Sequence, residues 1–106
     1  MFDEGSLKYR DYVLDRISRR LYYKDTTIPL KNKEFSLLEY FMMNIGRVLT
    51  RIQIIEDVWD RNICWNTNTV DVHVSRLRSK LFKQTGTQLI ETVYCVGYIL
   101  NEAIIE

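Results

Sequence analysis

The chain has 106 residues, 46% of them hydrophobic and 27% charged, and its formal net charge at pH 7 is +1. This length fits one compact domain with a single core, and the composition is ordinary for a globular protein. No apolar run approaches the roughly 20 residues that span a membrane, and the acidic, polar start does not resemble a signal peptide, so we expect a cytoplasmic protein without a membrane partner.

The two cysteines and the single histidine argue against a metal site or another cofactor. Cys64 and Cys95 are expected to be reduced thiols, because no secretory signal precedes them. No pair of cysteines or histidines has a metal-binding spacing. We also expect no enzyme, because no nucleophile, base and orienting group converge in the sequence.

The positive charge is concentrated in one short segment. Residues 1–66 hold 11 basic and 10 acidic residues, and residues 88–106 hold three glutamates and no Lys or Arg. Between these parts, residues 67–87 hold only Asp71 as an acid against four bases, namely Arg76, Arg78, Lys80 and Lys83. A surface for nucleic acid is therefore to be sought in this segment.

The first 30 residues contain four short segments typical of strands, rich in Tyr, Val, Ile and Thr. These segments are KYR, YVL, RLYY and TTIPL. Asp11, Asp15 and the Lys24-Asp25 pair interrupt them. The pattern predicts a small antiparallel meander.

A helical period begins at Asn32. Apolar residues then fall three or four apart, as on an amphipathic helix, and they are Phe35, Leu38, Phe41, Met42 and Ile45. Gly46 offers a left-handed stop. The spacing predicts a first helix over 32–45.

A second, shorter helix is predicted over 51–59. Thr50 and Gln53 have the spacing of a capping box, in which each side chain bonds the other residue's backbone N–H. The apolar face ends at Trp59. Residues 60–66 show no periodicity, and the polar run 66–69 favours a loop followed by a new helix start.

The third helix, over about 67–83, has two distinct faces. At 100° per residue, one narrow arc collects the apolar residues Val70, Val74, Leu77 and Leu81. The opposite arc collects Asn68, Val72, Ser75, Arg76, Ser79 and Lys83, and His73 and Arg78 flank it. The outer face is therefore short-chained, polar and cationic.

The C-terminal part predicts a β-hairpin. Two segments typical of strands, 89–94 and 98–100, are expected around a tight bend at Gly97. Helix, helix, loop, helix and hairpin follow one another in the order of a winged helix-turn-helix.

The outer face of the third helix has the side chains that read DNA in the major groove. An arginine pairs two donors with guanine, and we assign this role to Arg76, while the exposed Val72 suits a thymine methyl. Ser75 and Asn68 can bond base edges or phosphates. Phosphate contacts suit Arg51, Arg78, Lys80 and Lys83. The plain alternative is a solvated helix face. His73 could equally be bonded within the fold, and for Trp59 the residues alone favour packing in the core.

Three blocks resemble the C-terminal winged helix-turn-helix DNA-binding (effector) domain of OmpR/PhoB-type two-component response regulators. They are KEFSLLEYFMMNIGRVLTR over the first helix and the turn, TVDVHVSRLRSKL over the third helix and ETVYCVGYIL over the hairpin. The blocks have the right order and spacing, and the resemblance covers about residues 7–100.

The resemblance implies an α+β fold with an N-terminal four-stranded antiparallel sheet, three helices and a C-terminal β-hairpin wing. It implies that the third helix enters the major groove, with base contacts from Val72, Ser75 and Arg76. Contacts with the DNA backbone are implied at Arg51, Trp59, Asn68, His73, Arg78, Thr92 and Tyr98.

The resemblance also implies partners. Members of the family bind direct repeats of double-stranded DNA as head-to-tail pairs, so an isolated domain is expected to be a monomer. The loop that meets RNA polymerase corresponds to Asp60, Arg61, Asn62, Ile63, Cys64 and Trp65. A receiver domain belongs to the full-length proteins and is absent from these residues.

This sequence departs from the family pattern at three places. Lys31 stands at the start of the first helix, where Thr or Ser is usual, and Ser75 stands where an arginine often precedes Arg76. In the wing, Tyr94 replaces the arginine that would enter a narrow minor groove, so either Tyr94 makes a different contact or the wing contributes little.

Two other functions remain open from the residues alone. One is a winged-helix module that binds a protein partner without reading DNA. The other is the DNA-binding part of a membrane-linked transcription regulator.

Overall fold

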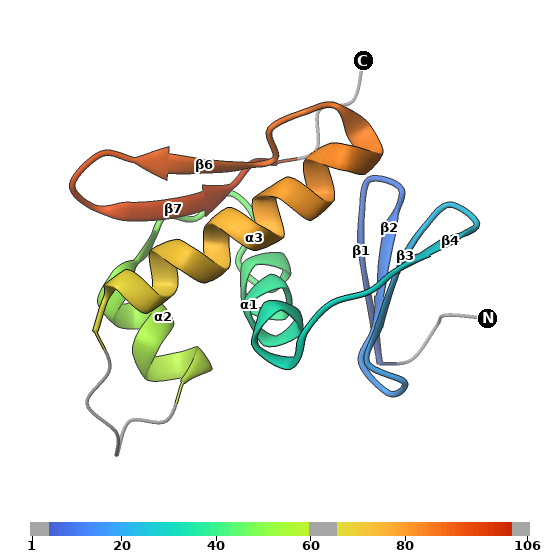
Figure 1. The fold of residues 1–106 in the computed structure, drawn as a ribbon, viewed down its shortest axis with the longest axis horizontal. Helices are drawn as coiled ribbons and strands as arrows, with labels where there is room; N and C mark the ends of the chain where they lie inside the picture. The colour runs from blue at the N-terminus through green and yellow to red at the C-terminus, as the bar shows by residue number, and fades with distance from the viewer. Residues whose placement is uncertain (1–4, 60–65, 103–106) are drawn as a thin grey trace.

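The computed structural model describes residues 5–59 and 66–102 (Figure 1). Its first unit is the predicted antiparallel meander, a four-stranded sheet in the order β1-β2-β3-β4. The strands are β1 (Ser6–Tyr9), β2 (Tyr12–Asp15), β3 (Arg20–Tyr23) and β4 (Thr26–Ile28). Arg10, Arg19 and Lys24 take positive φ angles of 54°, 55° and 53° in the three connections, which allows these short turns.

Three helices follow, as the periodicity predicts: α1 (Asn32–Met42), α2 (Arg51–Val58) and α3 (Asn68–Thr85). The capping box of α2 is confirmed, because the Gln53 N–H donates to Thr50 Oγ1 at 3.1 Å and the Thr50 N–H donates to Gln53 Oε1 at 2.9 Å. At the start of α1, Glu34 accepts the Lys31 N–H at 2.9 Å, although Lys31 supplies no side-chain cap.

The first helix is shorter than the predicted span 32–45. It ends at Met42, and residues 43–46 form turns. The reason is local, since the N–H of Asn44 bonds the Phe41 carbonyl and its side-chain amide bonds the Tyr40 carbonyl, at 3.0 and 2.8 Å. These bonds satisfy the last carbonyls of α1 without another helical turn.

A second sheet, which the sequence predicts only in part, joins the hairpin to the helices. Its strands are β5 (Leu49–Thr50), β6 (Ile90–Val93) and β7 (Gly97–Leu100), in the order β5-β7-β6. The two-residue strand β5 pairs antiparallel with the start of β7, so the wing is anchored beside the first residue of α2.

The prediction of a bend at Gly97 is wrong, because the hairpin turns at Tyr94–Val96. Cys95 takes a φ of 62°, and the Val96 N–H closes the turn on the Val93 carbonyl at 2.9 Å. Gly97 lies within β7, where a Cβ atom would stand 2.0 Å from the Leu49 carbonyl oxygen. Glycine is therefore needed at this position because the β5 backbone approaches it closely, and not because the chain bends there.

The core lies among the N-terminal sheet, α1, the inner face of α3, and the buried side chains of α2 and the second sheet. Figure 1 shows α3 crossing the molecule, with the β6–β7 hairpin beside it and the N-terminal sheet near its C-terminal end. The buried hydroxyl of Tyr12 donates to the Leu81 carbonyl at 2.8 Å and so ties the sheet to α3. Among the described residues, no helix is long and apolar enough to cross a membrane.

Candidate nucleic-acid interface

The two predicted faces of α3 are confirmed. Val70, Val74, Leu77 and Leu81 are each at most 2% exposed and form the inner stripe. The outer face is exposed at all six predicted positions: Asn68, Val72, Ser75, Arg76, Ser79 and Lys83. Val72 is 45% exposed although it is apolar. The helix therefore presents one continuous surface that the core does not use.

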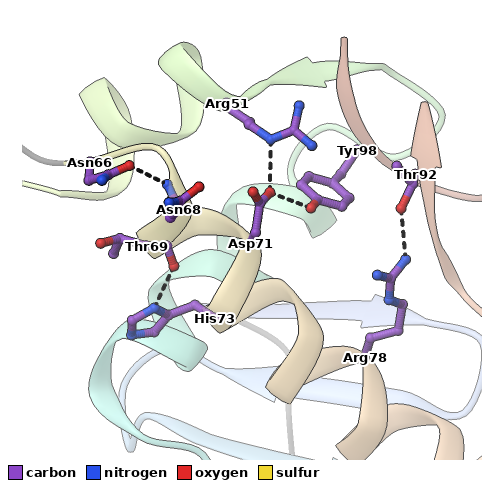
Figure 2. Close-up of polar contacts among 9 residues, drawn as sticks. All are labelled: Arg51, Asn66, Asn68, Thr69, Asp71, His73, Arg78, Thr92 and Tyr98. Carbon is purple, nitrogen blue, oxygen red and sulfur yellow. Dashed lines mark hydrogen bonds and ion pairs between the residues drawn. The ribbon is translucent and has the colours of Figure 1, made fainter. Parts of the chain in front are cut away.

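Beside this surface, Arg51, Asp71 and Tyr98 form one cluster from three elements (Figure 2). Asp71 Oδ1 accepts from Arg51 Nε at 2.8 Å and from the Tyr98 hydroxyl at 2.5 Å. Burial alone would raise the pKa of Asp71, but the bonds from Tyr98 and Arg51 lower it below its ordinary value. The carboxylate is thus ionised at neutral pH and joins α3 to α2 and to the wing.

Arg78 and Thr92 extend the cluster along the wing (Figure 2). Arg78 Nη1 donates to Thr92 Oγ1 at 3.1 Å and to the Ile90 carbonyl at 3.3 Å. The guanidinium carbons of Arg51 and Arg78 lie 5.3 and 5.8 Å from the centre of the Tyr98 ring, within cation–π range. Four of the predicted backbone contacts therefore belong to a single network.

His73 of α3 packs against Trp59, which follows α2. His73 Nδ1 lies 2.8 Å from the Thr69 carbonyl, and its ring meets the Trp59 ring edge-on at 5.1 Å. Trp59 is only 5% exposed, as Tyr98 is only 4% exposed. Both are core residues in this structure, and their DNA contacts stay predictions.

Asn68 lies exposed in the first turn of α3, where its backbone N–H donates to Asn66 Oδ1 at 2.9 Å (Figure 2). The wing tip carries Tyr94, which is 87% exposed, and the exposed Cys95. The loop Asp60–Trp65, expected to meet RNA polymerase, lies outside the described residues.

Lys80 does not belong to the phosphate-binding set that the sequence favours. Its Nζ donates to Glu34 Oε1 at 2.5 Å and to the Pro29 carbonyl at 3.1 Å. Glu34 is 1% exposed. Burial would raise the pKa of Glu34, but the hydrogen bond from Lys80 and the bond from the Lys31 backbone bring it below its ordinary value. Lys80 therefore pairs with Glu34 of α1, since a buried carboxylate needs a partner.

Sequence reasoning did not assign a role to Asp71 or Glu34. Asp71 is the only acid in α3, on an otherwise cationic helix, and that contrast was the available signal. Glu34 occupies the third position of α1, where a glutamate has an ordinary capping role, so its ion pair with α3 could not be read from the pattern. Among the described residues, no group of three or more His, Cys, Asp or Glu side chains could hold a metal ion.

Comparison with known proteins identifies the family. Residues 25–100 match the family described as "Transcriptional regulatory protein, C terminal". The transcriptional regulatory protein CusR of Escherichia coli K12 is 42% identical over 98 residues, which cover 92% of this chain and 43% of that protein. The sensory transduction protein RegX3 of Mycobacterium tuberculosis H37Rv is 51% identical over 76 residues, or 71% of this chain and 34% of that protein.

A solved structure of the response regulator AdeR DNA-binding domain, in complex with an intercistronic region, superposes with a TM-score of 0.81 at 26% identity. The match covers 91% of this chain and 98% of that domain. The chain spans less than half the length of the curated relatives it matches. It belongs to the family of transcriptional regulatory protein C-terminal domains, the winged helix-turn-helix DNA-binding domains of OmpR/PhoB-type response regulators.

Proposed function

We propose that this domain reads double-stranded DNA with α3 in the major groove, and that Val72, Ser75 and Arg76 contact the bases. The observation that carries the proposal is the outer face of α3, which exposes these three side chains together while the opposite stripe is buried. Arg76 supplies the two donors that guanine accepts, and Val72 supplies an apolar contact for a thymine methyl. An exposed valine has no role in the core.

Backbone contacts surround this surface. Arg51 and Arg78 offer cationic donors beside the wing, where Thr92 of β6 accepts a hydrogen bond from Arg78. Asn68 and His73 lie near the N-terminal end of α3. Backbone contacts are also proposed at Trp59, whose ring packs against His73, and at Tyr98, whose hydroxyl bonds Asp71. Contacts of this kind fix the register of the protein on the duplex and make affinity depend on salt.

The wing is proposed to reach the adjacent minor groove through Tyr94. Its exposure of 87% leaves the ring available at the tip of the hairpin. A tyrosine lacks the positive charge that attracts an arginine into a narrow minor groove. The wing contact therefore contributes less to sequence discrimination than the contacts of α3.

The remaining partners are proposed from the family. Two domains bind head-to-tail on a direct repeat, the loop 60–65 meets RNA polymerase, and a receiver domain in a longer protein controls the pair. The site of action is the cytoplasm, and no catalysis is assigned. The isolated domain is proposed to be a monomer.

Selection from a randomised duplex pool tests the DNA-reading proposal. We expect wild-type protein to enrich a short motif, and Arg76→Ala to lose the enrichment. Arg20→Ala is the matched control, because Arg20 is also an exposed arginine but lies on β3, outside the α3 surface. Binding to the selected duplex is then measured at two salt concentrations.

Two results would overturn the proposal. One is the absence of any enriched motif with folded wild-type protein. The other is an equal effect of Arg76→Ala and Arg20→Ala, since a non-specific loss of one charge would then explain the change.

A further inference from the structure

The single acid of α3 lies among groups proposed to bind phosphate. Asp71 carries a negative charge on the helix that faces a polyanion, so direct contact with DNA does not explain it. What its carboxylate does contact is one arginine of α2 and one tyrosine of β7, both through the same oxygen. The question is what these two bonds do for recognition.

The bonds restrict Arg51 in a specific way. Nε, the nitrogen nearest the chain, is held by Asp71, while the guanidinium carbon lies 5.3 Å from the Tyr98 ring centre. Because a guanidinium is planar, fixing Nε and one ring contact also fixes the direction of the two terminal nitrogens. Arg51 therefore presents its remaining donors in one direction relative to α3.

The same carboxylate sets the position of the wing. Tyr98 pairs with Leu49 of β5 and with Thr92 of β6, so it lies at the middle strand of the second sheet. Its hydroxyl reaches across to Asp71, and Arg78 of α3 bonds Thr92 from the same side. Asp71 and Arg78 thus form two attachments between the recognition helix and the wing (Figure 2).

We propose that Asp71 is a positioning residue that sets sequence discrimination, by holding Arg51 and Tyr98 in register with the base-reading face of α3. This inference rests on the proposed DNA-reading function. With Asp71 in place, the phosphate donors fit a duplex only when α3 is in its specific register. Without Asp71, the Arg51 guanidinium can contact phosphates in any register of α3 on the duplex.

Binding of variants to two duplexes tests this role. The duplexes are the motif selected by wild-type protein and a scrambled duplex of the same composition. For Asp71→Asn we expect the ratio of specific to non-specific affinity to fall about tenfold. Non-specific affinity rises, and its logarithmic salt slope steepens by about 0.9, as one additional phosphate contact requires.

Two further variants separate position from charge. Asp71→Glu keeps the charge but moves the carboxylate, so we expect it to lose discrimination as well. Glu91→Gln removes one negative charge from β6 at an exposed position that has no ion pair with a described residue. It should strengthen binding to both duplexes equally. Thermal unfolding of each variant confirms that the binding was measured on folded protein.

The inference is overturned if folded Asp71→Asn and Asp71→Glu keep the wild-type ratio. It is also overturned if Asp71→Asn and Glu91→Gln lower the ratio equally while Asp71→Glu leaves it unchanged. Failure of the proposed function gives a different result. Wild-type protein would then bind the selected duplex no more tightly than the scrambled duplex. A general loss of stability lowers affinity for both duplexes and leaves their ratio unchanged.

Discussion

Replacing Lys80 with methionine tests the ion pair that joins α3 to the buried carboxylate of Glu34 in α1. Lys80→Met keeps most of the apolar stem but removes the charge that Glu34 faces at 2.5 Å. Glu34 is 1% exposed, while the Lys80 side chain is 30% exposed. Glu34 would keep only the Lys31 N–H among the bonds that the structure describes.

The expected cost at pH 7 is about 3 kcal/mol in the free energy of unfolding. Removing one partner of a buried pair costs roughly 3–5 kcal/mol, and the partial exposure of Lys80 favours the lower end. For a domain of this size, each kcal/mol corresponds to about 4–8 °C in the melting temperature. The variant should therefore melt roughly 12–24 °C below wild type.

The cost depends on pH with a definite sign. In wild type the pKa of Glu34 is below its ordinary value of 4.5, so its contribution is present above that value and is lost as the pH falls through the folded pKa. In Lys80→Met the opposing charge is gone, burial dominates and the folded pKa rises. In that variant the contribution of Glu34 is most favourable at low pH and becomes less favourable as the pH increases.

Urea unfolding at pH 7 and at pH 4 measures the difference. We expect wild type and Lys80→Met to differ strongly at pH 7 and to differ less at pH 4. The double variant Glu34→Gln/Lys80→Met should recover about half of the loss at pH 7 or more, because no charge remains buried. A difference below about 1 kcal/mol at pH 7, or one that does not change with pH, refutes the reasoning.

Three other changes probe the helix start, the second sheet and the wing tip. Gly97→Ala should lower the free energy of unfolding by about 3 kcal/mol, because a Cβ atom would meet the β5 backbone. Gly86→Ala is its control: the new Cβ atom meets no other atom, so urea unfolding should show a loss of only about 1 kcal/mol. Thr50→Ala should cost about 1 kcal/mol by removing the cap of α2, whereas an unchanged unfolding midpoint would contradict that role. Tyr94→Ala should leave stability within about 0.5 kcal/mol of wild type but weaken binding to the selected duplex by about 1 kcal/mol. Unaltered affinity would remove Tyr94 from the interface.

The sequence alone determined the features that depend on residues close together in the chain. The two faces of α3 follow from a 3.6-residue period, which any reader of the pattern can project. The capping box of α2 depends on residues three apart, and the meander depends on short strands with short turns. Each of these was confirmed because the interacting groups lie within one element or in neighbouring ones.

Only the tertiary structure decided what the individual polar side chains do. Lys80 looked like a phosphate ligand until its partner 46 residues away was known, and Asp71 joins groups 20 and 27 residues away on two other elements. Gly97 looked like a bend because the strand that approaches it, β5, is two residues long and leaves no periodic signal. Such contacts are set by how the elements pack, since a local pattern specifies which side chain faces inward but not which group it meets there.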